Sequence, residues 1–208
     1  MIHQHPNRIG IDKVVEKFEN SDQVTIAGLG DSLTYGWMVQ KGFFERFLDS
    51  IETRYPDPRI LRINAGVPGD TAAGGASRLS QVLVKEPDLL IVQFALNDLF
   101  TGETPANFAS NLTRIVKMGS EAGACVVLVT SCPVPSDDVQ AAATRFYDAV
   151  RDTGRQTGVN VADLDRHWRD SIDSGMGRGP MYLSDGVHPS DAGHSLMAKG
   201  LLELFPAA

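Results

Sequence analysis

Short apolar runs alternate with longer amphipathic segments along nearly the whole chain. Each apolar run is followed by a turn rich in Gly, Pro or polar residues, which predicts buried strands. We expect five strands, at residues 24–27, 59–64, 89–95, 124–130 and 159–163. Helical spacing of apolar residues between them predicts helices at residues 12–19, 43–54, 74–85, 105–122, 137–157 and 192–204, with a short helix beginning at 164–168.

This β-α alternation is typical of a parallel sheet with right-handed crossovers and helices on both faces. The run at residues 89–95 is apolar nearly throughout, as expected for a strand that helices cover on both sides. The chain has 208 residues and shows no low-complexity tract or internal repeat. The sequence therefore predicts one α/β domain over residues 1–208, in which residues 1–22 form an N-terminal extension and a short helix.

Three of the predicted strands end in turns that carry chemically useful groups. Ser32 follows the first strand, Gly69 the second and Asn97 the third. Because ligands of open α/β sheets bind outside the carboxyl ends of the strands, we expect these three residues on one rim. Ser32 is thus a candidate nucleophile. A serine there is also a common helix N-cap, and its position alone leaves both interpretations open.

A catalytic serine needs a base, and His188 is the best candidate. It lies in a loop just before the last predicted helix, three residues after Asp185. A turn there would place the carboxylate on one ring nitrogen, which fixes the histidine tautomer while the other nitrogen faces outward. The alternative is a simple turn followed by the start of a helix. We expect His167 within a helix and His194 on the surface of the last helix.

The charge balance narrows the classes of partner. The formal net charge is -7, from 26 acidic and 19 basic residues without a Lys/Arg cluster, so we expect no nucleic-acid partner. No apolar stretch approaches the length of a membrane span, and residues 1–22 lack the apolar core of a signal peptide. We therefore expect a cytoplasmic protein without an integral membrane segment. The sequence leaves homo-oligomerisation open.

The two cysteines point to neither a disulfide nor a metal site. Cys125 and Cys132 lie at the two ends of the fourth predicted strand, about 20 Å apart if that strand is extended. This separation is too large for a disulfide. We expect Cys125 in the core, whereas Cys132 is nearer a strand end and could be exposed.

Four sequence blocks carry a family resemblance. They are residues 30–33 (Gly-Asp-Ser-Leu), 69–71 (Gly-Asp-Thr), 97–98 (Asn-Asp) and 185–189 (Asp-Gly-Val-His-Pro). In order, spacing and predicted location they resemble the SGNH, or GDSL, hydrolase family of esterases and lipases. The resemblance runs from about residue 24 to the C-terminus. It implies a flavodoxin-like three-layer α/β/α sandwich with a five-stranded parallel sheet, and a serine esterase that works without a metal or cofactor.

Carried over by position, the resemblance implies a role for each block. Ser32 would be the nucleophile, His188 the general base and acid, and Asp185 its orienting partner. Ser32 and Gly69 would donate backbone N–H groups to an oxyanion hole, and Asn97 its side-chain amide. These are the groups that acyl transfer requires, because a serine hydroxyl needs a base and the attacked carbonyl becomes an oxyanion. The chain departs from the family pattern in one place, where Ala replaces the usual Gly two residues before Asn97.

The expected substrate is a small-molecule carboxylic ester with a short acyl, aryl or acetyl group. Trp37 and Met38 follow the nucleophile turn, and Leu99 and Phe100 follow the third strand. Val134 lies in the Pro-rich turn after the fourth strand. These five residues are candidates for substrate binding, with ordinary packing as the alternative for each. Lysophospholipase and thioesterase activity at the same site are further alternatives, and a Gly-rich loop at residues 173–179 could edge the pocket.

Other functional motifs match less well. The sequence around Ser195 resembles a nucleophile elbow but lacks its final glycine and lies in a predicted helix. Residues 28–33 lack the third glycine of a dinucleotide fingerprint, and residues 66–75 lack the Gly-Lys-Ser/Thr ending of a P-loop.

Two further alternatives belong to other classes of function. A metal site would use Asp185, His188, Asp191 and His194, although Asp191 is better explained as a charge in the first turn of the last helix. A non-catalytic binding module on the same fold is the other alternative, since fold does not determine function. An ester-hydrolysis assay separates the binding module from the esterase.

Overall fold

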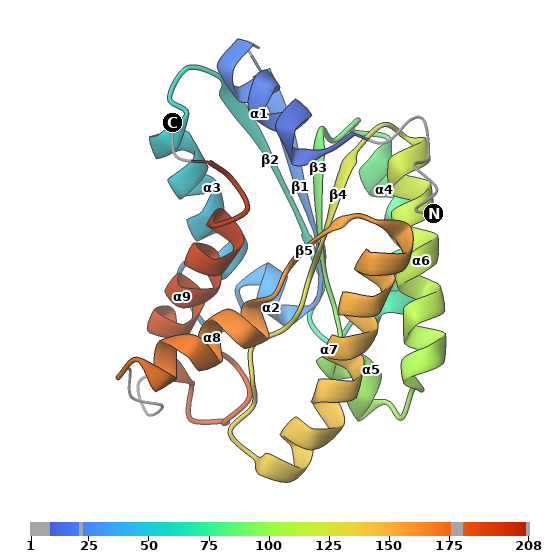
Figure 1. Ribbon diagram of the computed structural model, residues 1–208, viewed down its shortest axis with the longest axis vertical. Helices are drawn as coiled ribbons and strands as arrows, with labels where there is room; N and C mark the ends of the chain where they lie inside the picture. Colours follow the sequence, from blue (N-terminus) through green and yellow to red (C-terminus); the bar gives the residue numbers. More distant parts are fainter. Residues whose placement is uncertain (1–8, 21–22, 176–180, 207–208) are drawn as a thin grey trace.

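The computed structural model describes residues 9–20, 23–175 and 181–206. Its centre is a parallel sheet of five strands in the order β2-β1-β3-β4-β5 (Figure 1). The strands are β1 (Gln23–Gly30), β2 (Arg59–Gly66), β3 (Leu89–Gln93), β4 (Cys125–Val129) and β5 (Asn160–Ala162). All four neighbouring pairs are parallel, so every strand points its carboxyl end to the same edge. The predicted α/β fold with a five-stranded parallel sheet is confirmed.

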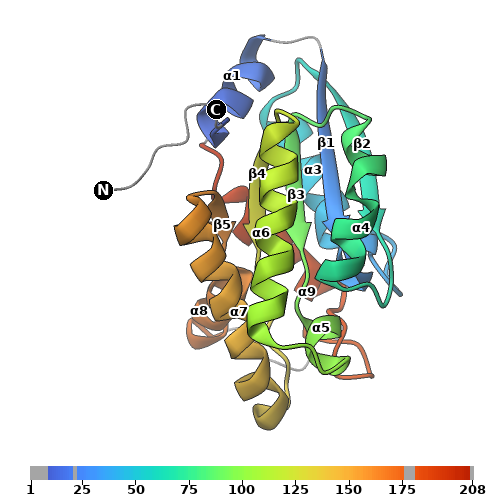
Figure 2. The ribbon, with the colours of Figure 1, turned by 90° about the vertical axis from the view of Figure 1, so that its right-hand side faces the viewer.

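Helices cover both faces of this sheet. They are α1 (Ile11–Asn20), α2 (Ser32–Tyr35), α3 (Phe43–Arg54), α4 (Ala72–Leu83), α5 (Leu96–Phe100), α6 (Pro105–Glu121), α7 (Asp137–Thr157), α8 (Leu164–Asp173) and α9 (Asp191–Leu202). Figure 1 shows α3, α8 and α9 on one side, and Figure 2 shows α4, α6 and α7 across the other. None of the helices in the described ranges is long and apolar enough to cross a membrane.

Alternate strand residues supply two separate hydrophobic cores. Ile26 and Ile91 belong to the core beneath α1, α3, α8 and α9. Their chain neighbours Ala27 and Leu90 face the core beneath α4, α6 and α7. Because successive side chains of a strand point to opposite faces, both sets must be apolar in a sheet that is covered on both sides. This explains the continuous apolar runs in the sequence.

Some strands and helices end at other residues than predicted, because contacts with neighbouring elements determine where they end. The third strand ends at Gln93 rather than at residue 95, because the paired residues of β1 and β4 end there too, at Gly30 and Val129. Helix α8 continues to Asp173, into the segment predicted as a Gly-rich loop. Residues 176–179 of that predicted loop lie outside the described residues.

The prediction that His194 lies on the surface of the last helix is wrong. Its side chain is buried, with 1% exposed, where α9 packs along α3. The backbone N–H of Phe43 donates a 3.0 Å hydrogen bond to Nδ1 of His194. Helix α3 begins after Gly42, which has no side chain to cap it, so His194 caps α3 from the neighbouring helix. An ion pair between Arg46 and Asp191 joins the same two helices.

Burial also overturns the suggested exposure of Cys132. Both cysteine side chains are buried. Burial raises the pKa of the Cys132 thiol well above its usual range, so the thiol stays neutral. A small buried thiol of this kind fills space in the core.

Burial, followed by the positive charge of Arg46, lowers the pKa of His194 to about 4. The unfolded state takes up a proton near pH 6.5, whereas the folded state does so only near pH 4. Stability from this site is therefore complete above about pH 6.5 and is lost as the pH falls through about 4. We expect the free energy of unfolding to fall by about 2 kcal/mol between roughly pH 7.5 and pH 5 from His194 alone.

Urea denaturation of wild type and His194→Gln at both pH values measures this contribution. Gln can accept the Phe43 hydrogen bond but does not titrate, so its pH dependence should be shallower by that amount. Ser195→Ala, at the partly buried neighbouring position of the same helix, should keep the wild-type slope. A wild-type slope in His194→Gln would contradict the assignment.

Candidate active site

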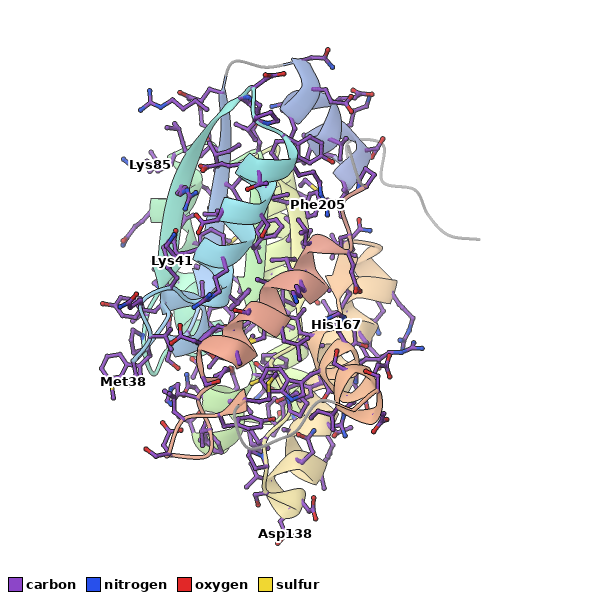
Figure 3. All side chains as sticks on the ribbon, turned by 90° about the vertical axis from the view of Figure 1, so that its left-hand side faces the viewer. Met38, Lys41, Lys85, Asp138, His167 and Phe205 are labelled. Carbon is purple, nitrogen blue, oxygen red and sulfur yellow. The ribbon has the colours of Figure 1, made fainter. Side chains whose placement is uncertain are left out.

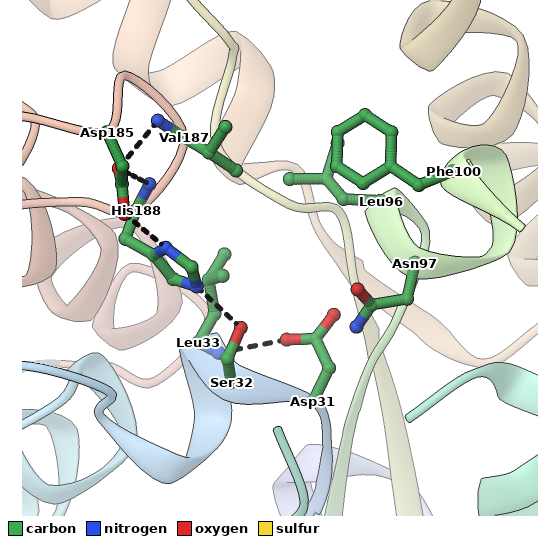
Figure 4. Close-up of a pocket in the computed structure, with 9 residues that line it drawn as sticks. All are labelled: Asp31, Ser32, Leu33, Leu96, Asn97, Phe100, Asp185, Val187 and His188. Carbon is green, nitrogen blue, oxygen red and sulfur yellow. Dashed lines mark hydrogen bonds and ion pairs between the residues drawn. The ribbon is translucent and has the colours of Figure 1, made fainter. Parts of the chain in front are cut away.

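A cavity of about 290 Å³ opens at the carboxyl edge of the sheet (Figure 4). Its lining comes from the segments after β1 and β3 and from the loop before α9. The lining residues are Asp31, Ser32, Leu33, Leu96, Asn97, Phe100, Asp185, Val187 and His188. Four of the five predicted catalytic and oxyanion residues thus line one cavity, whereas Gly69 is not among the lining residues and lies in the turn described below.

Ser32, His188 and Asp185 form a hydrogen-bonded line along one wall of the cavity (Figure 4). The Oγ atom of Ser32 lies 3.0 Å from Nε2 of His188, and Nδ1 of His188 lies 2.8 Å from Oδ2 of Asp185. This is the arrangement of a Ser-His-Asp triad, in which the carboxylate selects the tautomer that leaves Nε2 free to accept the serine proton.

The local chain conformation explains how Asp185 reaches His188. Its Oδ1 atom accepts hydrogen bonds from the backbone N–H groups of Val187 and His188, both at 2.9 Å. Desolvation alone would raise the pKa of Asp185, but these two bonds and the His188 ring outweigh it and lower the pKa below its usual value. The carboxylate is therefore charged at neutral pH and able to stabilise an imidazolium.

The His188 loop is tied to the rest of the fold on both sides. Leu183 N–H donates to the carbonyl oxygen of His188 at 2.8 Å, and Ser190 N–H donates to that of Met181 at 2.9 Å. The hydroxyl of Tyr182 donates to the carbonyl oxygen of Pro133 in the turn after β4. These bonds hold the loop in one conformation over the cavity.

The segment around Ser32 settles whether this serine is a helix cap. The N-cap of α2 is Asp31, whose Oδ1 accepts the N–H of Leu33 at 2.9 Å. Ser32 is the first helical residue, so its hydroxyl is free to point to His188. A glycine is required at position 30, two residues before Ser32. A Cβ there would lie 2.1 Å from the Thr34 hydroxyl and 2.6 Å from the Gln93 carbonyl oxygen.

Gly69 lies in a tight turn after β2. Asp70 N–H donates to the carbonyl oxygen of Val67 at 3.0 Å, and Gly69 has φ +81°. Pro68 and Gly69 thus occupy the central positions of a turn with the type II signature, which leaves the Gly69 N–H unused within the turn. Within the described ranges, neither this N–H nor that of Ser32 has an acceptor.

Asn97 joins this turn to the cavity. Its Nδ2 donates a 2.9 Å hydrogen bond to the carbonyl oxygen of Asp70, the residue after Gly69. The second amide hydrogen is left for another acceptor, since an amide nitrogen carries two donors. The three predicted oxyanion donors therefore sit on neighbouring segments that hydrogen bonds connect.

Gln93, which the sequence did not single out as a functional residue, is fully buried behind the Ser32 segment. Its amide nitrogen donates to Oδ2 of Asp31 at 3.3 Å and to the Ser131 hydroxyl at 2.9 Å. Its amide oxygen accepts the Thr34 hydroxyl at 2.9 Å. An amide can serve donors and acceptors together, so Gln93 links the residues flanking Ser32 to β3 and β4. Its position as a polar residue in an apolar strand was the only signal in the sequence.

Two buried carboxyl groups lie beside the site. Burial raises the pKa of Asp31 to about 7, against the hydrogen bonds from Leu33 N–H and Gln93. Burial likewise raises the pKa of Asp98 to about 6, although the backbone N–H of Ala72 at the start of α4 donates to it. Desolvation thus keeps both groups partly protonated near neutral pH, which limits the negative charge close to Ser32.

The structure separates the five candidate substrate-binding residues. Phe100 lines the cavity. Leu99 packs against the core beneath α4, α6 and α7, and Val134 is buried in that core. Trp37 and Met38 are 43% and 73% exposed and are not among the lining residues; Figure 3 shows Met38 projecting outward at the carboxyl edge. Leu33, Leu96 and Val187 form apolar lining that the sequence analysis did not propose.

The side chains proposed for the two alternative sites, a nucleophile at Ser195 and a metal site, have other partners in the structure. The Ser195 hydroxyl donates to the Asp191 carbonyl oxygen in its own helix. Of the proposed metal ligands, Asp191 pairs with Arg46 and His194 accepts the Phe43 N–H. In the described part of the chain, no group of three or more His, Cys, Asp or Glu side chains could hold a metal ion.

Comparison with known families agrees with this geometry. A model of the GDSL-like Lipase/Acylhydrolase family matches residues 29–196. The chain belongs to this family. It is 31% identical over 171 residues to the esterase TesA of Pseudomonas aeruginosa, covering 80% of each chain. It is 26% identical over 164 residues to an arylesterase of Vibrio mimicus, covering 77% of this chain and 78% of the relative.

Solved structures share the fold at lower sequence identity. A catalytic mutant of the acetylxylan esterase Axe2 of Geobacillus stearothermophilus superposes with a TM-score of 0.78 at 17% identity, covering 87% of this chain and 93% of that one. TesA superposes with a TM-score of 0.73 at 21% identity, covering 86% and 97%. As a GDSL-family member with esterase relatives, the protein is a carboxylic ester hydrolase.

The Gln93 network makes a prediction about stability. Gln93→Met keeps the approximate volume but leaves the Thr34 and Ser131 hydroxyls and one oxygen of Asp31 without this partner. We expect the free energy of unfolding to fall by at least about 3 kcal/mol, because three buried polar groups lose this partner and each one left unpaired costs about 1–3 kcal/mol. Urea denaturation measures the change, with the exposed Gln81→Met in α4 as the matched control. Equal stability of the two variants would show that the network contributes little.

Proposed function

We propose that the protein hydrolyses small carboxylic esters through an acyl-enzyme intermediate at Ser32. The observation that carries the proposal is the hydrogen-bonded line from Ser32 Oγ through His188 to Asp185 in an open cavity. His188 takes the Ser32 proton as Oγ attacks the ester carbonyl carbon. The protonated imidazole then gives this proton to the leaving alcohol, and Asp185 stabilises the transient positive charge.

Deacylation repeats the sequence with water. His188 removes a proton from a water molecule, which attacks the acyl carbon, and the Ser32 oxygen leaves with the proton that His188 returns. In both steps the carbonyl oxygen carries negative charge. The N–H groups of Ser32 and Gly69 and the Asn97 amide bind this oxyanion, and fixed donors of this kind supply a large share of the rate enhancement.

The cavity supports a neutral ester with a short acyl group. Leu33, Leu96, Phe100 and Val187 give it apolar walls, and about 290 Å³ accommodates only a small part of a longer substrate. The charged Asp185, the partly ionised Asp31 and the net charge of -7 disfavour an anionic substrate. Short-chain acyl, aryl and acetyl esters meet these requirements.

Exposed apolar side chains around the carboxyl edge support an uncharged alcohol portion. Large exposed apolar residues in the described ranges occur mostly in the segments that follow β1, β2 and β3. They are Tyr35, Trp37, Met38, Val67 and Phe100, whereas Val84 lies at the end of α4. Exposed apolar surface grouped near a cavity is typical of ligand-binding regions. On this ground Trp37 and Met38 remain candidates for contact with the part of the ester that extends beyond the cavity.

Ser32→Ala tests the nucleophile directly. We expect the release of p-nitrophenol from p-nitrophenyl acetate to fall by at least about 10³-fold, because among the described residues Ser32 is the hydroxyl paired with His188. Ser195→Ala is the matched serine control and should retain wild-type activity. Equal rates in wild type and Ser32→Ala would refute the mechanism. Absence of turnover by wild type across esters of varied acyl length and alcohol would favour a binding module.

Asn97→Ala tests the oxyanion hole. We expect kcat to fall by about 10²–10³-fold, the usual effect of removing one donor to the oxyanion. Asn107→Ala, at an exposed position in α6, should change kcat by less than about twofold, since surface substitutions away from the site usually change stability by less than about 0.5 kcal/mol. Circular dichroism checks that both variants are folded. A change below about threefold in folded Asn97→Ala would contradict its role.

A further inference from the structure

Arg78, on the inner face of α4, reaches the carboxyl ends of the two strands that precede Ser32 and Gly69. Each of its guanidinium nitrogens has a separate acceptor. Nε pairs with Oδ2 of Asp70 at 2.7 Å, Nη1 donates to the carbonyl oxygen of Ala65 at 2.7 Å, and Nη2 donates to that of Gly30 at 3.1 Å. One side chain thus joins β1, β2 and the turn after β2.

These three acceptors flank the oxyanion donors. Gly30 lies two residues before Ser32, while Ala65 and Asp70 bracket the turn that contains Gly69. The carbonyl oxygen of Asp70 in turn accepts the Asn97 amide. Arg78 is therefore linked to the segments of Ser32 and Gly69 directly, and to Asn97 through Asp70.

The sheet alone does not hold these segments together. The ladder between β1 and β2 ends at the pair Gly30 and Gly66, and both chains leave the sheet beyond it. Past that point, the backbone hydrogen bond from Val67 N–H to the Gly30 carbonyl oxygen is the remaining main-chain link among the described contacts. The spacing between Ser32 N–H and Gly69 N–H thus depends on side chains.

The residues around Asp70 allow its carboxylate to pair with Arg78. Gly74 has no side chain, and a Cβ there would lie 1.9 Å from Oδ1 of Asp70. That same oxygen accepts the N–H of Thr71 at 2.9 Å, so both oxygens of the Asp70 carboxylate are used. The planar guanidinium offers donors in several fixed directions, which the single ammonium of Lys cannot match.

We propose that Arg78 is a positioning residue that sets the distance between the Ser32 and Gly69 N–H donors of the oxyanion hole. This inference rests on the proposed acyl-enzyme function. Arg78 is not among the cavity-lining residues, so it acts through the segments it holds. Donors must lie about 2.7–3.1 Å from the oxyanion, and a displacement of about 1 Å can cost about 10²-fold in rate.

A role of this kind separates kcat from KM. The oxyanion forms only in the transition state, so misplaced donors lower kcat while ground-state binding stays nearly unchanged. We expect Arg78→Met to lower kcat for p-nitrophenyl acetate by about 10- to 100-fold with KM within about threefold. Arg78→Lys, which can pair with Asp70 but cannot reach all three acceptors, should show an intermediate loss.

Arg62→Met is the matched control. Arg62 lies on β2, is buried to a similar extent and pairs with Glu45, Asp49 and Glu52, and none of its described hydrogen bonds or ion pairs reaches an oxyanion segment directly. We expect its loss to change thermal stability and to leave kcat within about twofold. Phenylboronic acid, which forms a tetrahedral adduct with an active serine, adds a second readout. Its inhibition constant should rise in the Arg78 variants by about the same factor as kcat/KM falls.

The outcomes distinguish this inference from the proposed function. Unchanged kcat in folded Arg78→Met or Arg78→Lys, a rise in KM alone, or an equal loss of kcat in Arg62→Met would overturn the role of Arg78. If Arg78→Met does not fold, the kcat of Arg78→Lys tests the proposal instead. If neither variant folds, Arg78 has a purely structural role and the proposal is wrong. Ser32→Ala and Asn97→Ala, assayed in parallel, test the proposed function itself.

Discussion

The hydrogen bond between Ser32 and His188 joins segments that are 156 residues apart in the chain. Its 3.0 Å length depends on how α3 and α9 pack, because α3 follows the Ser32 segment and α9 follows the His188 loop. The buried bond between Phe43 and His194 and the ion pair between Arg46 and Asp191 lie at the beginnings of these two helices. This helix contact outside the cavity thus helps to set the relative position of Ser32 and His188, together with the hydrogen bonds of the His188 loop.

A second constraint comes from the parallel sheet. All strands end at one edge, so the residues after β1, β2 and β3 meet there without any further folding information. The sheet places them only approximately, because its backbone ladder stops before the functional residues. Side chains on neighbouring elements complete the arrangement. Gln93 binds the residues that flank Ser32, and Arg78 and Asn97 bind the residues that flank Gly69.

The hydrogen bonds of Gln93 lie in the interior of the protein, where apolar contacts are the usual kind. Gln93, Ser131 and Asp31 are buried, and each has a hydrogen-bond partner. Satisfied buried networks favour one conformation, since any displacement leaves a polar group unpaired in a medium of low polarity. Burial also keeps Asp31 partly protonated near neutral pH. The site therefore combines fixed donors with limited negative charge, which suits the formation of an oxyanion at Ser32.

The sequence by itself determined the fold class, the order of the strands and of the longer helices, and the family, whereas the short helices α2 and α5 were not predicted. Short apolar runs can be recognised without tertiary contacts, and Ser32, Gly69, Asn97, Asp185 and His188 stand in ordered local motifs. The catalytic roles of these five residues stay predictions until the variants are assayed. Most strand and helix limits were close, and β3 ended early because its neighbours did.

Only the tertiary structure decided the residues that support the site. Gln93 looks like an irregularity in an apolar strand, Arg78 like an ordinary helix charge, and His194 like a surface histidine. Their partners are distant in sequence: 59 residues separate Gln93 from Thr34, 48 separate Arg78 from Gly30, and 151 separate His194 from Phe43. Local propensity carries no information about such pairs. A side chain's role there depends on burial and on which distant group lies within hydrogen-bond distance, and folding alone creates both conditions.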